Sequence, residues 1–129
     1  MVFTQVKETC LYVENLDDTE SFYHGKLEMP IISKVEDRHI FFNCGSSVLL
    51  CFLNKATIQE KKLPPHFAIG RQHIALEVPQ KEYAKAKEKV LAKKIQITHF
   101  QEWPGNFESF YFSDPDGHVL EIVPQGMWG

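Results

Sequence analysis

Three ionisable side chains lie in stretches that are typical of β-strands and could bind a divalent metal ion. Glu8 opens the stretch Glu-Thr-Cys-Leu-Tyr-Val, and His73 opens the similar stretch His-Ile-Ala-Leu-Glu-Val. Glu121 lies in the final stretch of this kind, Val-Leu-Glu-Ile-Val. An imidazole with two carboxylates leaves coordination positions open and suits Mn²⁺, Ni²⁺, Co²⁺, Fe²⁺ or Zn²⁺. Such a metal can chelate vicinal substrate oxygens and stabilise an enolate or alkoxide as it forms. We therefore predict one divalent metal ion per site, bound by Glu8, His73 and Glu121.

Other positions are candidates for contacting a substrate or moving a proton. The base could be Glu8, once it is displaced from the metal, or His66 in the segment Pro-Pro-His-Phe. Glu121 is the third candidate for a catalytic residue. Arg71 has the strand parity of the ionisable residues and could hold an anionic group; a surface ion pair is its alternative. Cys51 is also a candidate for contacting the substrate. Its alternative role is that of a small apolar side chain that fills space, as free cysteine often does. The remaining substrate candidates could form an apolar wall or belong to the core: Tyr12 and Trp103.

The chain repeats one order of elements. His73 follows Glu8 by 65 residues (73 − 8), close to half of the 129-residue chain, as expected for two copies of one unit. Each half has one stretch of helical periodicity among runs rich in β-formers, which predicts the order βαβββ. We expect an α+β fold. The expected organisation is a single domain, 1–129, whose modules, about 1–54 and 71–126, are joined by a long connection, 55–70.

Strand alternation assigns the candidate ligands to faces. Because successive side chains of a strand point to opposite sides of the sheet, one face of each module is aliphatic and should receive the helix. The other face is expected to carry Glu8 and Cys51 in the first module and His73 and Glu121 in the second. In this interpretation Glu8 corresponds to His73, and Cys51 corresponds to Glu121, which follows 70 residues later (121 − 51).

Composition narrows the class of protein. A hydrophobic share of 43%, a charged share of 24% and a net charge of −3 are those of a soluble globular protein. Acidic and basic residues are interspersed, without the basic block that nucleic-acid binding requires. No apolar run approaches the ~18 residues of a membrane span, and the N-terminus lacks the pattern of a signal peptide. The odd count of 3 cysteines, without a close pair, favours reduced thiols and a cytoplasmic location.

Three segments carry a resemblance to a known family. They are Leu-Tyr-Val-Glu-Asn-Leu-Asp-Asp-Thr-Glu-Ser-Phe-Tyr (11–23), His-Ile-Ala-Leu-Glu-Val (73–78) and Phe-Tyr-Phe-Ser-Asp-Pro-Asp-Gly-His-Val-Leu-Glu-Ile (110–122). Together they resemble the vicinal oxygen chelate superfamily, which includes glyoxalase I, bleomycin-resistance proteins, fosfomycin-resistance enzymes, methylmalonyl-CoA epimerase and extradiol dioxygenases. The resemblance implies paired βαβββ modules that form a U-shaped cup around a metal, usually in a homodimer.

The resemblance also implies ligands at four positions, which are Glu8, Cys51, His73 and Glu121 in this chain. Glyoxalase I has a glutamate at the position of Cys51, so the chain departs from that four-ligand pattern. It is closer to the fosfomycin-resistance and extradiol enzymes, which use two histidines and one glutamate, although Glu8 stands where their first histidine would be. Whether Glu8 meets His73 of its own chain or of a partner is left open by the order of the modules.

The expected function is a metal-dependent lyase, isomerase or epoxide-opening transferase that acts on a small molecule with vicinal oxygens. The main alternative is a metal-free protein of the bleomycin-resistance type that binds a small molecule or an antibiotic. An extradiol dioxygenase is disfavoured because the set of two histidines and one carboxylate is incomplete. A structural or regulatory copy without catalysis is the fourth possibility. The expected partner is a small molecule, with no nucleic acid and no membrane.

Overall fold

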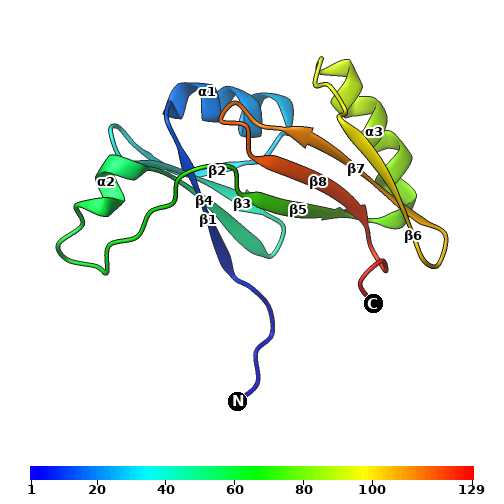
Figure 1. The fold of residues 1–129 in the computed structure, drawn as a ribbon, viewed down its shortest axis with the longest axis horizontal. Coiled ribbons are helices and arrows are strands. Elements are labelled where there is room, and N and C mark those ends of the chain that lie inside the picture. The colour runs from blue at the N-terminus through cyan, green and yellow to red at the C-terminus, as the bar shows by residue number, and fades with distance from the viewer. The chain divides into compact units, whose positions relative to one another are not determined.

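The structure is a computed structural model that describes residues 1–129, and the chain divides into two compact units, 1–70 and 71–129 (Figure 1). The elements of the first unit are β1 (Glu8–Val13), α1 (Leu16–Glu20), the π-helix η1 (Ser21–Lys26), β2 (Ile31–Val35), β3 (His39–Cys44), β4 (Ser47–Leu53) and α2 (Asn54–Ile58). Those of the second unit are β5 (His73–Val78), the 3₁₀ turn η2 (Gln80–Glu82), α3 (Tyr83–Ala92), β6 (His99–Trp103), β7 (Phe107–Ser113) and β8 (Val119–Pro124).

Each unit contains one four-stranded sheet with the same topology. The strand orders are β1-β4-β3-β2 and β5-β8-β7-β6. The first strand of each unit is parallel to the last, β1 to β4 and β5 to β8, and the other neighbours are antiparallel. A parallel pair needs a crossover connection, which the helix after the first strand supplies. The α+β class and the repeated βαβββ order are confirmed.

In the first unit, the helical segment covers one face of the sheet. It begins at Asn15, whose side-chain oxygen accepts the backbone N–H of Asp18, the usual arrangement at a helix N-cap. The change from α-helix to π-helix after Glu20 coincides with two consecutive buried rings, Phe22 and Tyr23. The Tyr23 ring packs 5.5 Å from the ring of Phe42 on β3. The face that carries Phe42 is therefore the helix-covered face of this sheet.

In the second unit, α3 is attached to the sheet by apolar packing and a polar contact. Phe110 is fully buried on β7, and its ring lies 5.6 Å from that of Tyr83 at the start of α3. The Glu108 carboxylate accepts hydrogen bonds from the Tyr83 hydroxyl at 3.0 Å and from the Lys87 ammonium at 2.9 Å. Burying a phenylalanine side chain contributes roughly 1.5–3 kcal/mol, so the apolar contact dominates and the polar group fixes the helix position.

The residues between α3 and β6 continue the end of the helix. Although Ile95 opens a run rich in β-formers, its backbone N–H still donates to the carbonyl of Val90 and Lys94 has a left-handed φ of 62°, so the strand begins only at His99. The long connection between the modules contains regular structure, since the short helix α2, Asn54–Ile58, occupies its start.

The turn that precedes β8 depends on one buried carboxylate. Asp114 is buried, and its Oδ1 accepts the backbone N–H groups of Asp116 at 2.9 Å and His118 at 2.8 Å. Gly117 occupies the left-handed region at φ 84°, which glycine adopts without strain. The imidazole of the buried His118 in turn accepts the backbone N–H of Gln72, just before β5. This network fixes β8 against β5 and so positions the residues at the start of both strands.

We expect Asp114→Ala to lower the free energy of unfolding by about 1–3 kcal/mol, because it removes the acceptor of the buried His118 N–H and of the part-buried Asp116 N–H. Asp114→Asn retains an acceptor oxygen and should lose less. Urea denaturation followed by tryptophan fluorescence measures the change, since both tryptophans lie in the second unit. A loss below about 0.5 kcal/mol, as for an ordinary surface substitution, would contradict this role.

Candidate metal and ligand site

His73 and Glu121, two of the three predicted ligands, lie beside each other in the second unit. The register pairs Glu121 on β8 with Ala75 on β5, so His73, two residues before Ala75, points to the same face. The His73 Nε2 atom lies 3.4 Å from Oε1 of Glu121. The other ring nitrogen, Nδ1, lies 2.8 Å from the carbonyl oxygen of Val119. A carbonyl only accepts, so Nδ1 donates, and in a neutral imidazole the lone pair is then on Nε2, toward Glu121.

The Glu121 carboxylate is buried with its hydrogen-bonding capacity unfilled. Its residue is 5% exposed, whereas the side chain of His73 is 51% exposed. The Oε2 atom of Glu121 is buried and has no hydrogen-bond partner. Burying a carboxylate is costly unless a partner compensates its charge, so an orphaned buried oxygen needs a physical explanation.

An aromatic and hydroxyl network lies on the same face, which we call the Glu121 face. Tyr111 on β7 pairs with Glu121 in the register. Burial raises the pKa of the Tyr111 hydroxyl, and a hydrogen bond to the Glu121 carboxylate raises it further. Ser109, two residues earlier, accepts a hydrogen bond at 2.9 Å from the indole N–H of Trp103, one of the expected substrate residues. Sequence reasoning missed Tyr111 and Ser109. The usable signal was the β6–β7 hairpin, in which Trp103 pairs with Phe107 and every second residue after Phe107, namely Ser109 and Tyr111, lies on the same face.

Glu8, the third predicted ligand, is exposed at the start of β1 in the first unit. The side chains of Cys10 and Tyr12 share its face, as alternation requires. Burial raises the pKa of the Cys10 thiol, and the negative charge of Glu8 adds to that shift. Within either unit, no group of three or more His, Cys, Asp or Glu side chains could hold a metal ion. The second unit contributes His73 and Glu121, and Glu8 belongs to the first.

The expected position of Cys51 is wrong. In the register of the first sheet Cys51 pairs with Leu11 on β1 and with Ile40 on β3, both in the core. Cys51 is therefore on the helix-covered face, at 0% exposure, opposite to Glu8. The first-unit position that corresponds to Glu121 is Leu50, since Val48 pairs with Glu8 as Val119 pairs with His73, and the offset is 71 (119 − 48). No carboxylate occupies the corresponding position in β4.

The histidine of the connection, His66, contacts the Glu8 face of the first sheet. Its Nδ1 atom forms a hydrogen bond with the hydroxyl of Tyr12. Its ring lies 5.1 Å from that of Phe52 on β4, which pairs with Tyr12 in the register. His66 and Tyr12 were separate candidates from the sequence, and the structure brings them together. Arg71, the remaining candidate, is exposed two residues before β5 begins.

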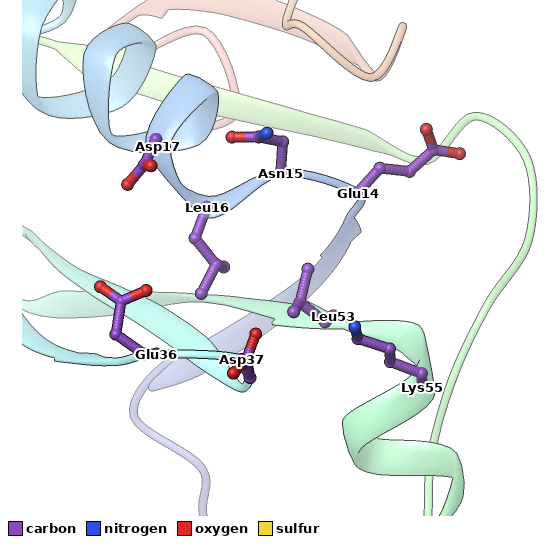
Figure 2. A pocket seen from close by; sticks show the side chains of 8 residues that line it. All are labelled: Glu14, Asn15, Leu16, Asp17, Glu36, Asp37, Leu53 and Lys55. Carbon is purple, nitrogen blue, oxygen red and sulfur yellow. The ribbon is translucent and has the colours of Figure 1, made fainter.

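A shallow pocket in the first unit does not coincide with these residues. Figure 2 shows it between Leu16 and Leu53, with acidic side chains at its rim. Its volume of about 180 Å³ is below the ~300 Å³ at which small-molecule sites usually begin. The rim carboxylates of Asp17 and Glu36 are more than four-fifths exposed and pair with Lys34. The pocket has the features of a solvated surface depression, and we assign it no ligand.

The chain repeats the βαβββ unit, and one unit carries the ionisable pair His73 and Glu121 on its two parallel strands. These features define a class of α+β proteins with two such modules. A family model described as the Glyoxalase/Bleomycin resistance protein/Dioxygenase superfamily matches residues 5–122. The chain belongs to this superfamily.

Solved structures agree with this assignment. A lactoylglutathione lyase from Agrobacterium tumefaciens is 28% identical with a TM-score of 0.92, covering 99% of this chain and 98% of that chain. A glyoxalase-related enzyme from Fulvimarina pelagi is 22% identical with a TM-score of 0.72, covering 95% and 89%. A glyoxalase/bleomycin resistance protein/dioxygenase from Alicyclobacillus acidocaldarius is 17% identical with a TM-score of 0.70, covering 93% and 90%. The last two show similarity of fold alone. No helix of the chain has the length and apolar character that a membrane span needs.

Proposed function

We propose that this protein is a divalent-metal-dependent enzyme of the glyoxalase class that acts on a small molecule with vicinal oxygens. The observation that carries the proposal is the pair formed by His73 and the buried Glu121. The Nε2 lone pair of a neutral His73 faces the carboxylate oxygen Oε1 of Glu121 at 3.4 Å, and both atoms are acceptors. Two facing acceptors need a proton or a cation between them.

The second carboxylate oxygen supports a metal ion as the cation. A proton on His73 would satisfy Oε1 of Glu121 and leave the buried Oε2 without a partner. A divalent cation can neutralise the whole carboxylate and accept the imidazole lone pair. The hydrogen bond from His73 Nδ1 to the Val119 carbonyl is of the kind that orients a metal-binding histidine and makes it more basic. The donor set therefore fits a divalent metal ion.

Glu8 is proposed as the third ligand, from the same chain or from a partner. When bound, the metal would supply Lewis-acid polarisation of substrate oxygens. The residues of the chain would orient the substrate and move its proton, with Glu8 as the candidate base. The Tyr111 hydroxyl, bonded to Glu121, would hold that carboxylate in position. We also propose that the protein forms a homodimer.

The relative from Agrobacterium tumefaciens supports a substrate class. Its name describes a lyase of lactoylglutathione, a thioester whose lactoyl group has a hydroxyl next to the thioester carbonyl. That pair of vicinal oxygens is the arrangement that a metal with open positions can chelate. We propose a 2-hydroxyacyl thioester of this kind, or its precursor, as the ligand of this chain.

Metal content of the purified protein tests the proposal. After treatment with a chelator, the protein is titrated with Mn²⁺, Ni²⁺, Co²⁺, Fe²⁺ or Zn²⁺, and bound metal is measured by elemental analysis. We expect about one ion per chain, lost in His73→Ala and weakened in Glu8→Gln. His99→Ala is the matched control, because His99 lies on the same face of the second sheet, where its Nε2 bonds the Gln101 side chain.

A metal-free ligand-binding protein is the second candidate. It is favoured by one observation, the gathering of only two ligand side chains, His73 and Glu121, within a single unit. Thioester binding by the chelator-treated protein, together with no metal uptake and no change in thermal stability with any of the ions, would support this candidate and contradict the first.

A further inference from the structure

The segment that carries His66, residues 59–70, is held against the rest of the first unit by hydrogen bonds to its backbone. The side-chain amide of Asn54 donates to the carbonyl of Ala68 at 2.8 Å, and the amide oxygen of Asn54 accepts the N–H of Ala68 at 3.3 Å. The backbone N–H of His66 also donates to the carbonyl of Thr57 at 3.3 Å. Because the backbone is held at both His66 and Ala68, the position of the His66 ring is fixed, and its contact with Tyr12 follows from the fold.

The hydrogen bond to Tyr12 selects one form of the His66 ring. The phenolic hydroxyl is the better donor of the two groups and an imidazole nitrogen the better acceptor. Burial raises the pKa of the Tyr12 hydroxyl, and the Cys10 thiol adds to that shift, so the hydroxyl keeps its proton. Tyr12 therefore donates to Nδ1, and the proton of a neutral His66 is on Nε2. The Nε2–H group forms no hydrogen bond within the first unit, and the side chain is exposed.

The Phe52 ring that packs against His66 belongs to a cluster of aromatic rings and one cation on the Glu8 face. The Phe52 ring lies 5.2 Å from that of Phe41, which stacks at 3.8 Å on the ring of His39. The guanidinium of Arg38 lies 5.4 Å from the centre of the Phe52 ring and donates to the carboxylate of Glu60 at 3.2 Å. This end of the face combines an apolar floor with hydrogen-bond donors, which suits a ligand segment that ends in acceptor oxygens.

The distance along β1 decides what His66 can do. Tyr12 follows Glu8 by four residues, which corresponds to about 13 Å along a strand. A general base must come within ~3 Å of the proton that it removes. A reacting group held at Glu8 is thus too far from Tyr12 and His66 for proton transfer, whereas the far end of an elongated ligand is within reach.

We propose that His66 binds the distal end of an elongated ligand through its Nε2–H group, which donates to a carbonyl or carboxylate oxygen about 13 Å from the reacting oxygens. The inference rests on the proposed function, which places the reacting group near Glu8. It assigns His66 to ligand specificity rather than to acid–base chemistry, and Tyr12 to the positioning of its ring.

Two probes of different length test the inference. They are S-lactoylglutathione and the S-lactoyl thioester of N-acetylcysteamine, which has the same reacting group without the tripeptide. Their Kd values are measured by calorimetry on metal-loaded protein. Losing one hydrogen bond should weaken the long probe about 3- to 10-fold in His66→Ala and leave the short probe unchanged. The diethyl ester of the long probe identifies the acceptor, since it retains the carbonyl oxygens and lacks carboxylates.

Histidine NMR provides a readout that does not require turnover. We expect the Nε2–H form of His66 in the wild type and a mixture of both forms in Tyr12→Phe. Lys62→Ala, an exposed substitution in the same segment, is the control and should change neither Kd nor the ring form.

The outcomes separate the inference from the function on which it rests. Equal weakening of both probes in His66→Ala, or no change for the long probe, overturns the inference while metal binding leaves the proposed function intact. Absence of both metal and thioester binding in the wild type overturns the two together.

Discussion

Glu121→Gln is expected to abolish metal binding without weakening the fold. The substitution retains the volume of the side chain and removes the charge that the cation neutralises. We expect the affinity for divalent metal to fall by about 100-fold or more, because losing even an outer partner of a metal ligand costs 10- to 100-fold. A metal present at 100 times its Kd stabilises the folded protein by about 2.7 kcal/mol, which raises Tm on the order of 10 °C. In the variant this rise should disappear.

The metal-free variant gives a second and opposite signal. The buried Oε2 atom of Glu121 has no hydrogen-bond partner, so removing the charge relieves an uncompensated burial. Metal-free Glu121→Gln should be as stable as the metal-free wild type or more stable, by roughly 1 kcal/mol. Glu77→Gln is the matched control, because Glu77 lies on the same face of β5 and is exposed. Retention of full metal affinity in Glu121→Gln would refute the ligand assignment.

Cys51→Glu is expected to destabilise the first unit strongly, although it would restore the glutamate that the resemblance to glyoxalase I suggests for this position. Cys51 is fully buried on the helix-covered face, paired with Leu11 and Ile40. A carboxylate placed there has no partner and must stay buried, at a cost of about 3–5 kcal/mol. That loss is a large share of the ~5–15 kcal/mol by which a domain of this size is stable.

Leu50→Glu is the informative partner of that substitution. Leu50 is 8% exposed and corresponds in register to Glu121, on the face of Glu8. Its carboxylate could turn toward that face, so we expect a smaller loss of stability than for Cys51→Glu. Far-UV circular dichroism during urea denaturation measures both variants against Cys51→Ala. Equal destabilisation by the two glutamates would contradict the assignment of faces.

The sequence alone was sufficient for the repeated βαβββ order and for the pairing of His73 with Glu121. These features depend on local periodicity, which a strand expresses through every second residue. In β5 and β8 one face carries ionisable residues and the other is aliphatic, so the parity of each strand is unambiguous. The family assignment confirms the fold that this periodicity predicted.

Only the tertiary structure assigned β4 its faces and brought His66 to Tyr12. The β4 sequence, Ser-Val-Leu-Leu-Cys-Phe-Leu, is apolar on both sides and offers no contrast from which parity can be read. A shift of one residue in register exchanges the two faces of a strand, and the correct offset of 71 in place of 70 is such a shift. The contact of His66 with Tyr12 spans 54 positions of sequence and depends on how Asn54 and Thr57 hold the intervening segment. Such long-range contacts follow from the packing of elements and not from the periodicity of any one of them.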